Sequence, residues 1–181
     1  TSAAMALAIA ATSANASNPY IPASTGALST VDASELVRGY LEYVDTLRDR
    51  SDVSFERMQS AVGNQLRWGE FGSGDTSSVF PEGDWITLSF SDAGPATGHT
   101  AILHFGSDQD PNGPLPFCRL SFGDLRDRLL RAGYAEGREW GELGEVVAWL
   151  FSKDDFWIEV GTRWVRPNDD LMCVWTIYAR G

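Results

Sequence analysis

The sequence lacks the short motifs by which most enzyme classes are recognised. It has no H-E-x-x-H pair for zinc, no G-x-S-x-G turn, no P-loop and no dinucleotide-binding glycine pattern. The chain has two histidines, His99 and His104. They are five apart on or beside one expected strand and so point to opposite faces, which prevents them from sharing a metal ion or a proton. A hydrolase with paired carboxylates stays open, because acidic residues are plentiful.

Basic residues and long apolar runs are also scarce. Fourteen Lys and Arg stand against 25 Asp and Glu, a net charge of −11. Nucleic acids and anionic membrane surfaces would be repelled by such a chain, whereas a basic protein would be attracted and steered. The alternative is that the charge serves solubility alone. No apolar run after residue 16 reaches about 18 residues, so no transmembrane helix is expected.

The first sixteen residues are rich in alanine and uncharged. They end in Ala14-Asn15-Ala16, the small-x-small pattern that signal peptidases cleave, so residues 1–16 are interpreted as a signal-peptide remnant. The alternative is an ordered N-terminal helix or arm. We therefore expect a periplasmic or secreted protein, with an extended arm at residues 17–31 and a single α+β domain at residues 32–181.

Only two cysteines are present, Cys118 and Cys173, and no C-x-x-C spacing indicates a metal or redox site. In an oxidising compartment the two are expected to form a disulfide bond. Closing a loop of about 55 residues would stabilise the fold by on the order of 4 kcal/mol. Two buried free thiols are the alternative.

Hydrophobic periodicity predicts helices followed by strands, that is, an α+β fold with helices packed on an antiparallel sheet. Capping signals place the helices at residues 32–50, 54–62 and 121–133. Strands are expected at residues 85–90, 100–105 and 117–120, and in a C-terminal three-strand meander at residues 145–152, 156–162 and 171–179. The glycine-rich residues 64–83 are expected to form a loop carrying the exposed Trp68.

Two helix starts resemble each other. Val53-Ser54-Phe55 and Leu120-Ser121-Phe122 each begin an amphipathic helix that ends near a glycine and precedes strands. Two tandem helix-plus-sheet units would explain this echo, as would chance similarity between two capped helices.

The sharpest local motif is a calcium-loop opening, with Asp108, Asp110 and Asn112 at alternate positions before a glycine. Arg119 stands where a bidentate glutamate belongs, so an ordinary surface turn is the default interpretation and no cofactor is expected.

The chain resembles exported bacterial inhibitor and immunity proteins. The resemblance rests on its leader, its acidic α+β domain and the two similar Ser-Phe helix starts. These include proteins with the β-lactamase-inhibitor-protein-like fold and the periplasmic immunity proteins of toxin systems. The resemblance implies a non-catalytic chain that occludes a basic secreted or periplasmic enzyme or toxin, such as a cell-wall hydrolase. It assigns no site residues. A carboxylate-dependent hydrolase and an envelope scaffold are the alternatives.

Acidic loops and exposed aromatics are where such a chain is expected to contact its partner. The candidate contact residues are Trp68, Glu82, Asp84, Asp108 and Asp110.

Overall fold

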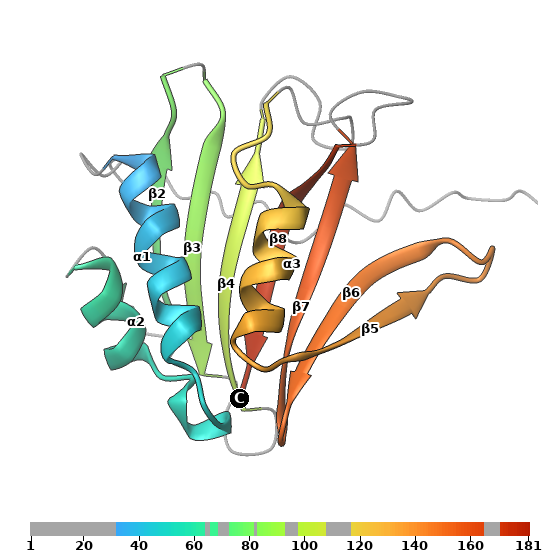
Figure 1. Ribbon diagram of the computed structural model, residues 1–181. Helices are drawn as coiled ribbons and strands as arrows, with labels where there is room; N and C mark the ends of the chain where they lie inside the picture. Colours follow the sequence, from blue (N-terminus) through green and yellow to red (C-terminus); the bar gives the residue numbers. More distant parts are fainter. Residues whose placement is uncertain are drawn as a thin grey trace, which may run out of the picture.

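The computed structural model describes residues 32–63, 66–68, 73–81, 83–92, 98–107, 117–164 and 171–181. In these residues the chain forms an eight-stranded antiparallel sheet with helices on one face (Figure 1). The helices are α1 (Ala33–Thr46), α2 (Phe55–Val62) and α3 (Phe122–Arg131), with a short 3-10 helix η1 (Arg50–Asp52). The strands are β1 (Arg67–Trp68), β2 (Ser73–Val79), β3 (Trp85–Asp92), β4 (His99–Gly106), β5 (Ala135–Trp140), β6 (Val146–Lys153), β7 (Phe156–Trp164) and β8 (Met172–Arg180).

The sheet order is β1-β2-β3-β4-β8-β7-β6-β5. Helices α1 and α2 precede the first four strands along the chain, and α3 precedes the last four. The last strand of each group lies at the centre, where β4 pairs with β8, and Leu103 lies opposite Ile177. The chain is therefore α+β, and its C-terminal strands form a meander, as the sequence predicts.

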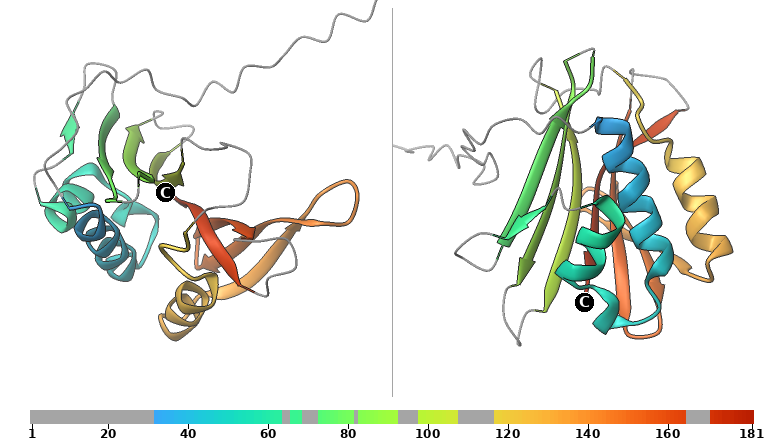
Figure 2. Two further views of the ribbon diagram at one scale, coloured as in Figure 1. Left: turned by 90° about the horizontal axis from the view of Figure 1, so that it is seen from above. Right: turned by 90° about the vertical axis from the view of Figure 1, so that its left-hand side faces the viewer.

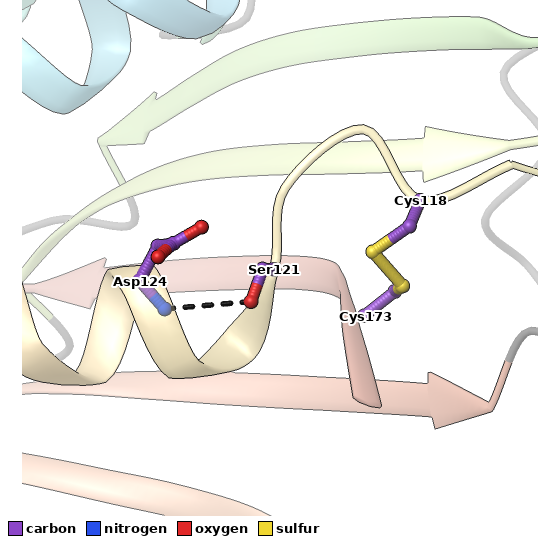
Figure 3. Close-up of a disulfide and its surroundings, with 4 residues drawn as sticks. All are labelled: Cys118, Ser121, Asp124 and Cys173. Carbon is purple, nitrogen blue, oxygen red and sulfur yellow. Dashed lines mark hydrogen bonds between the residues drawn. A yellow bond between two sulfur atoms is a disulfide. The ribbon is translucent and has the colours of Figure 1, made fainter. Parts of the chain in front are cut away.

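Each helix begins at a side chain that satisfies an otherwise unpaired backbone N–H group. Asp32 accepts a hydrogen bond from the backbone N of Ser34 at the start of α1, and Ser54 caps α2 in the same way. Ser121 accepts from the backbone N of Asp124 at 3.4 Å (Figure 3). Helix α1 ends at Thr46, short of the predicted residue 50, because the chain leaves the helical conformation at the next residue and η1 begins with a capping box of its own.

Alternation along the strands separates the two faces of the sheet. In β3, the side chains of Ile86, Leu88 and Phe90 are buried on the face that the helices cover. The hydroxyl of Tyr40, in α1, donates to the carbonyls of Ala101 and Ile177 at 3.0 and 3.2 Å. The core thus lies between the helices and the centre of the sheet.

Three sequence predictions need correction. Residues 117–120 form no strand; a single bridge joins Ser121 to Cys173 instead. Residues 64–83 contain β2, which periodicity missed because its buried positions are Gly74, Thr76 and Ser78 rather than large apolar residues. Strand β5 was missed because it is a mostly exposed edge strand with no apolar alternation.

None of the described helices is long and apolar enough to span a membrane.

Candidate functional site

The face of the sheet opposite the helices, called the open face below, is covered by no described helix (Figure 2). Strand alternation fixes what it displays: in β3, Trp85, Thr87 and Ser89 point away from the buried positions and are only partly exposed. Antiparallel sheets often leave one face to solvent, so the chemistry of this face depends on which large side chains it carries.

Two tryptophans lie flat over glycines of the neighbouring strand. Trp85 is the register partner of Gly106, and a Cβ built on that glycine would lie 2.0 Å from the indole. Likewise, a Cβ on Gly161 would lie 2.8 Å from the indole of Trp175. No residue with a side chain fits at either position without moving the tryptophan. The glycines therefore let both rings spread across the backbone.

A local irregularity brings Trp175 to the open face. Gly161 pairs with Thr176 and Thr162 pairs with Val174, so Trp175 is an extra residue in β8 with no partner in the β7–β8 register. Such a bulge redirects side chains. Here it places an indole on the open face next to the position of His104.

His104 connects the two tryptophans. Its ring centroid lies 5.2 Å from that of Trp85, nearly parallel, and 4.3 Å from that of Trp175, edge to face. The guanidinium carbon of Arg163 lies 3.5 Å from the centroid of the Trp175 ring, a close cation–π contact. Trp85, His104, Trp175 and Arg163 form a continuous band across β3, β4, β8 and β7, called the aromatic row below.

Burial, and to a lesser degree the charge of Arg163, lower the pKa of His104 from 6.5 to about 4. The imidazole is therefore neutral at physiological pH. The aromatic row presents three uncharged rings and one permanent cation.

Further apolar side chains extend the open face on both sides of the aromatic row. Val79, opposite Trp85 in the register, is 44% exposed, and Trp157 of β7 is 43% exposed. Between Trp157 and the centre, Glu159 and Arg180 form an ion pair at 3.1 Å. The open face thus carries exposed apolar side chains next to an ion pair.

Asp84, a predicted partner-binding residue, takes part in a buried ion pair. It is only 6% exposed and pairs with Arg119 at 3.3 Å. The same guanidinium lies over the rings of Phe80 and Phe117, at 4.3 and 5.0 Å from their centroids. The carboxylate therefore holds the residues that follow Phe117 against the β2–β3 turn, and a contact of Asp84 with a partner stays a prediction.

The other predicted contact and calcium residues lie outside the part of the chain that the structure describes. They are the side chain of Trp68, and Glu82, Asp108, Asp110 and Asn112. Of Trp68 only the backbone is described, as part of β1.

The predicted cysteine pair is joined in the structure. A disulfide bond links Cys118 to Cys173, with 5.4 Å between the Cα atoms (Figure 3). Next to it, the backbone N of Val174 donates to the carbonyl of Leu120 at 2.9 Å. The bond fastens the segment before α3 to the beginning of β8, the strand that also carries Trp175.

The two histidines lie on opposite faces, as their spacing predicts. His99 stacks on Phe90, a residue of the helix-covered face, at 5.7 Å between centroids, whereas His104 lies on the open face. Among the described residues no group of three or more His, Cys, Asp or Glu side chains is placed to hold a metal ion.

A shallow depression of about 750 Å³ lies away from the aromatic row. Its lining includes the carboxylates Asp49, Asp92 and Asp155 together with Arg50 and His99. Asp92 lies 3.4 Å from the imidazole Nδ1 of His99. Several carboxylates therefore share a concave surface at this location.

No protein-family model, curated protein or solved structure matches the chain. Its function must therefore follow from its own chemistry. Sequence reasoning missed the aromatic row because the row forms only when four strands are in register. One sequence feature could have indicated the row: Trp85 lies among the polar positions of a strand whose apolar positions alternate with them.

Proposed function

We propose that the chain is a non-catalytic inhibitor or immunity protein that binds a basic secreted or periplasmic enzyme or toxin through its open face. The observation that carries this proposal is the aromatic row, which lies flat on a face that no described helix covers. Tryptophan and arginine are the residues most enriched among those that dominate binding energy at protein interfaces. The glycines beneath the indoles let both rings lie against the backbone before binding, which reduces the entropy lost on association.

The charge of the chain supports a basic partner. With a net charge of −11, the chain would attract a cationic protein and accelerate its encounter, most strongly at low ionic strength. Hydrolases that act on an anionic envelope are a class for which positive charge is useful, so a cell-wall hydrolase is the favoured target.

The proposed mechanism is occlusion. The three rings cover the mouth of the target's cleft and exclude water from it. Arg163 then meets an acidic group there, such as one of the paired carboxylates by which glycoside hydrolases act. A permanent guanidinium suits this role because it matches a carboxylate at every physiological pH.

Two further observations support export and the inhibitor-like architecture. A disulfide bond is stable in oxidising compartments, which suits a periplasmic or secreted protein. The order α1, α2 and four strands, then α3 and four strands, is consistent with two tandem helix-plus-sheet units, as the echo between the starts of α2 and α3 suggests.

The test begins with the intact exported chain as bait for the secreted fraction of the source organism, followed by purification of the captured protein. Its activity should fall in proportion to the chain added, up to one equivalent. Trp175→Ala and Arg163→Ala should each raise the dissociation constant about 30-fold or more, the equivalent of about 2 kcal/mol. Arg38→Ala is the matched control, because this exposed arginine lies on α1, on the helix-covered side.

A carboxylate-dependent hydrolase is the second candidate, and the depression lined by Asp49, Asp92 and Asp155 favours it. It predicts that the purified chain turns over a glycan and loses this activity in Asp92→Asn. If turnover is found, or if the open-face variants bind the captured protein like the wild type, the inhibitor proposal is wrong. If the chain neither binds a partner nor turns over a substrate, the envelope-scaffold alternative remains.

A further inference from the structure

A second surface stands apart from the aromatic row. Strands β5 and β6 form a hairpin that projects beyond α3, away from the rest of the sheet, in both views from the front and from above (Figures 1 and 2). The residues from Glu139 to Val147, called the hairpin tip below, carry three strongly exposed apolar side chains: Trp140 at 59%, Leu143 at 94% and Val147 at 49%. No described residue buries them, and leucine this exposed at the end of a hairpin is unfavourable in water.

The backbone of the hairpin tip is held by its own hydrogen bonds. The backbone N of Gly144 donates to the carbonyl of Gly141 at 3.1 Å, and that of Gly141 donates to the carbonyl of Glu145 at 2.8 Å. Gly144 adopts φ +80°, which disfavours any residue with a side chain. The turn therefore has one preferred shape.

A side chain completes this arrangement. The carboxylate of Glu145 accepts a hydrogen bond from the backbone N of Leu143 at 3.1 Å. The backbone at Leu143 is thus held at the apex before any contact is made, so less backbone ordering is needed on binding.

The hairpin tip is also acidic. Glu139, Glu142 and Glu145 are all exposed, and no basic residue occurs between positions 139 and 147. A second copy of the chain is a poor occupant, because two such tips would bring like charges together. The complementary surface is a cleft with cationic side chains at its rim and apolar walls inside.

We infer that the hairpin tip inserts into a cationic, apolar-walled cleft of the protein that the open face binds. Leu143 is the anchor at the apex, Trp140 packs behind it, and Glu139 and Glu142 meet basic side chains at the rim. This inference rests on the proposed function, since it assigns a second contact to the same basic exported partner. Two separate contacts on one partner raise both affinity and selectivity.

Binding kinetics against the protein purified in the test above separate the contributions. Leu143→Ser should speed dissociation about tenfold or more, because it removes a buried anchor. The double variant Glu139→Gln/Glu142→Gln should slow association and flatten its salt dependence, while leaving Glu145 to hold the turn. Leu171→Ser is the matched control, since it removes an exposed leucine outside both proposed surfaces.

A photo-crosslinking side chain at position 143 gives an independent readout. It should form an adduct with the same partner, mapped to a cleft lined by Lys or Arg. If Leu143→Ser dissociates at the wild-type rate while Trp175→Ala binds the partner more weakly, insertion of the hairpin tip is refuted and the proposed function stands. An adduct with a second copy of the chain, or with a partner surface free of basic residues, would also refute it. If the wild-type chain binds no basic exported protein, both proposals fail.

Discussion

Two tyrosines on α1 are both fully buried, yet their hydroxyls have different surroundings. The hydroxyl of Tyr40 donates to carbonyls of β4 and β8, the two strands at the centre of the sheet. The hydroxyl of Tyr43 has no hydrogen-bond partner among the described residues. Burial raises the pKa of both phenols, so neither ionises at physiological pH. One hydroxyl thus stabilises the fold, whereas the other is buried without compensation.

Removing these hydroxyls should therefore have opposite results. We expect Tyr40→Phe to lower the free energy of unfolding by about 1–1.5 kcal/mol, because a buried hydrogen bond is lost. Tyr43→Phe should leave it unchanged or raise it, since no bond is broken and a polar atom leaves the core. Urea unfolding of the three proteins checks this. Equal losses in both variants would contradict the assignment.

His104 should make stability depend on pH. Its pKa is about 4 in the folded chain and 6.5 without the fold, so the unfolded chain binds more protons between these values. The free energy of unfolding should therefore fall as the pH drops from 6.5 to 4. His104→Gln should reduce this fall by on the order of 2 kcal/mol, a figure below the full shift because the ring is partly exposed.

Unfolding curves of wild type and His104→Gln between pH 4 and pH 7 isolate this effect, because the carboxylates titrate equally in both. His99→Gln is the control, with the other histidine removed. A wild type and His104→Gln with the same pH slope would contradict the desolvated environment of the ring.

At the scale of elements, the segment before α3 is held by a disulfide bond and an ion pair rather than by strand pairing. The disulfide bond fixes one end to β8, and Arg119 fixes it to Asp84 and two phenyl rings. These contacts hold the connection that leads into α3 against the strand that bears Trp175. An element predicted as a strand is thus a cross-linked connection.

Breaking the disulfide bond should destabilise the chain by about 2–5 kcal/mol, because the unfolded state regains the freedom of a 55-residue loop. Cys118→Ser/Cys173→Ser avoids a lone reactive thiol, and reduction of the wild type gives the same comparison without substitution. Denaturant unfolding measures the loss, and thiol titration of the native wild type should find no free thiol. Two reactive thiols in the native oxidised protein would rule the bond out.

At the scale of the whole molecule, one sheet runs through both halves of the chain. The β4–β8 ladder joins them, and Leu103 at its centre is fully buried beside Ile177 and Leu88. Helix α1 reaches across this junction through Tyr40. Neither half therefore has a separate core, and the two should unfold together.

Leu103→Ala tests this coupling. We expect a loss of about 2–5 kcal/mol from the cavity it leaves, with unfolding still a single transition. Tryptophan fluorescence reports both halves, and far-UV circular dichroism reports the whole sheet, so the two curves should coincide. Separate transitions in the variant would show that the halves fold independently.

The sequence by itself determined the features that depend on neighbours along the chain. The helix starts at Asp32, Ser54 and Ser121 follow from capping side chains, and the buried alternation of β3 follows from its period of two. The cysteine pair followed from the presence of only two cysteines in the chain and from the expectation of an oxidising compartment.

Only the tertiary structure decided what depends on residues far apart in the chain. Alternate residues of β2 are buried, although they are glycine, threonine and serine and give no apolar pattern. Asp84 is buried because Arg119 meets it across 35 positions. The aromatic row exists because register sets Trp85 over Gly106, and because a bulge turns Trp175 toward His104. Register and bulges arise from pairing between strands, so no local pattern encodes them.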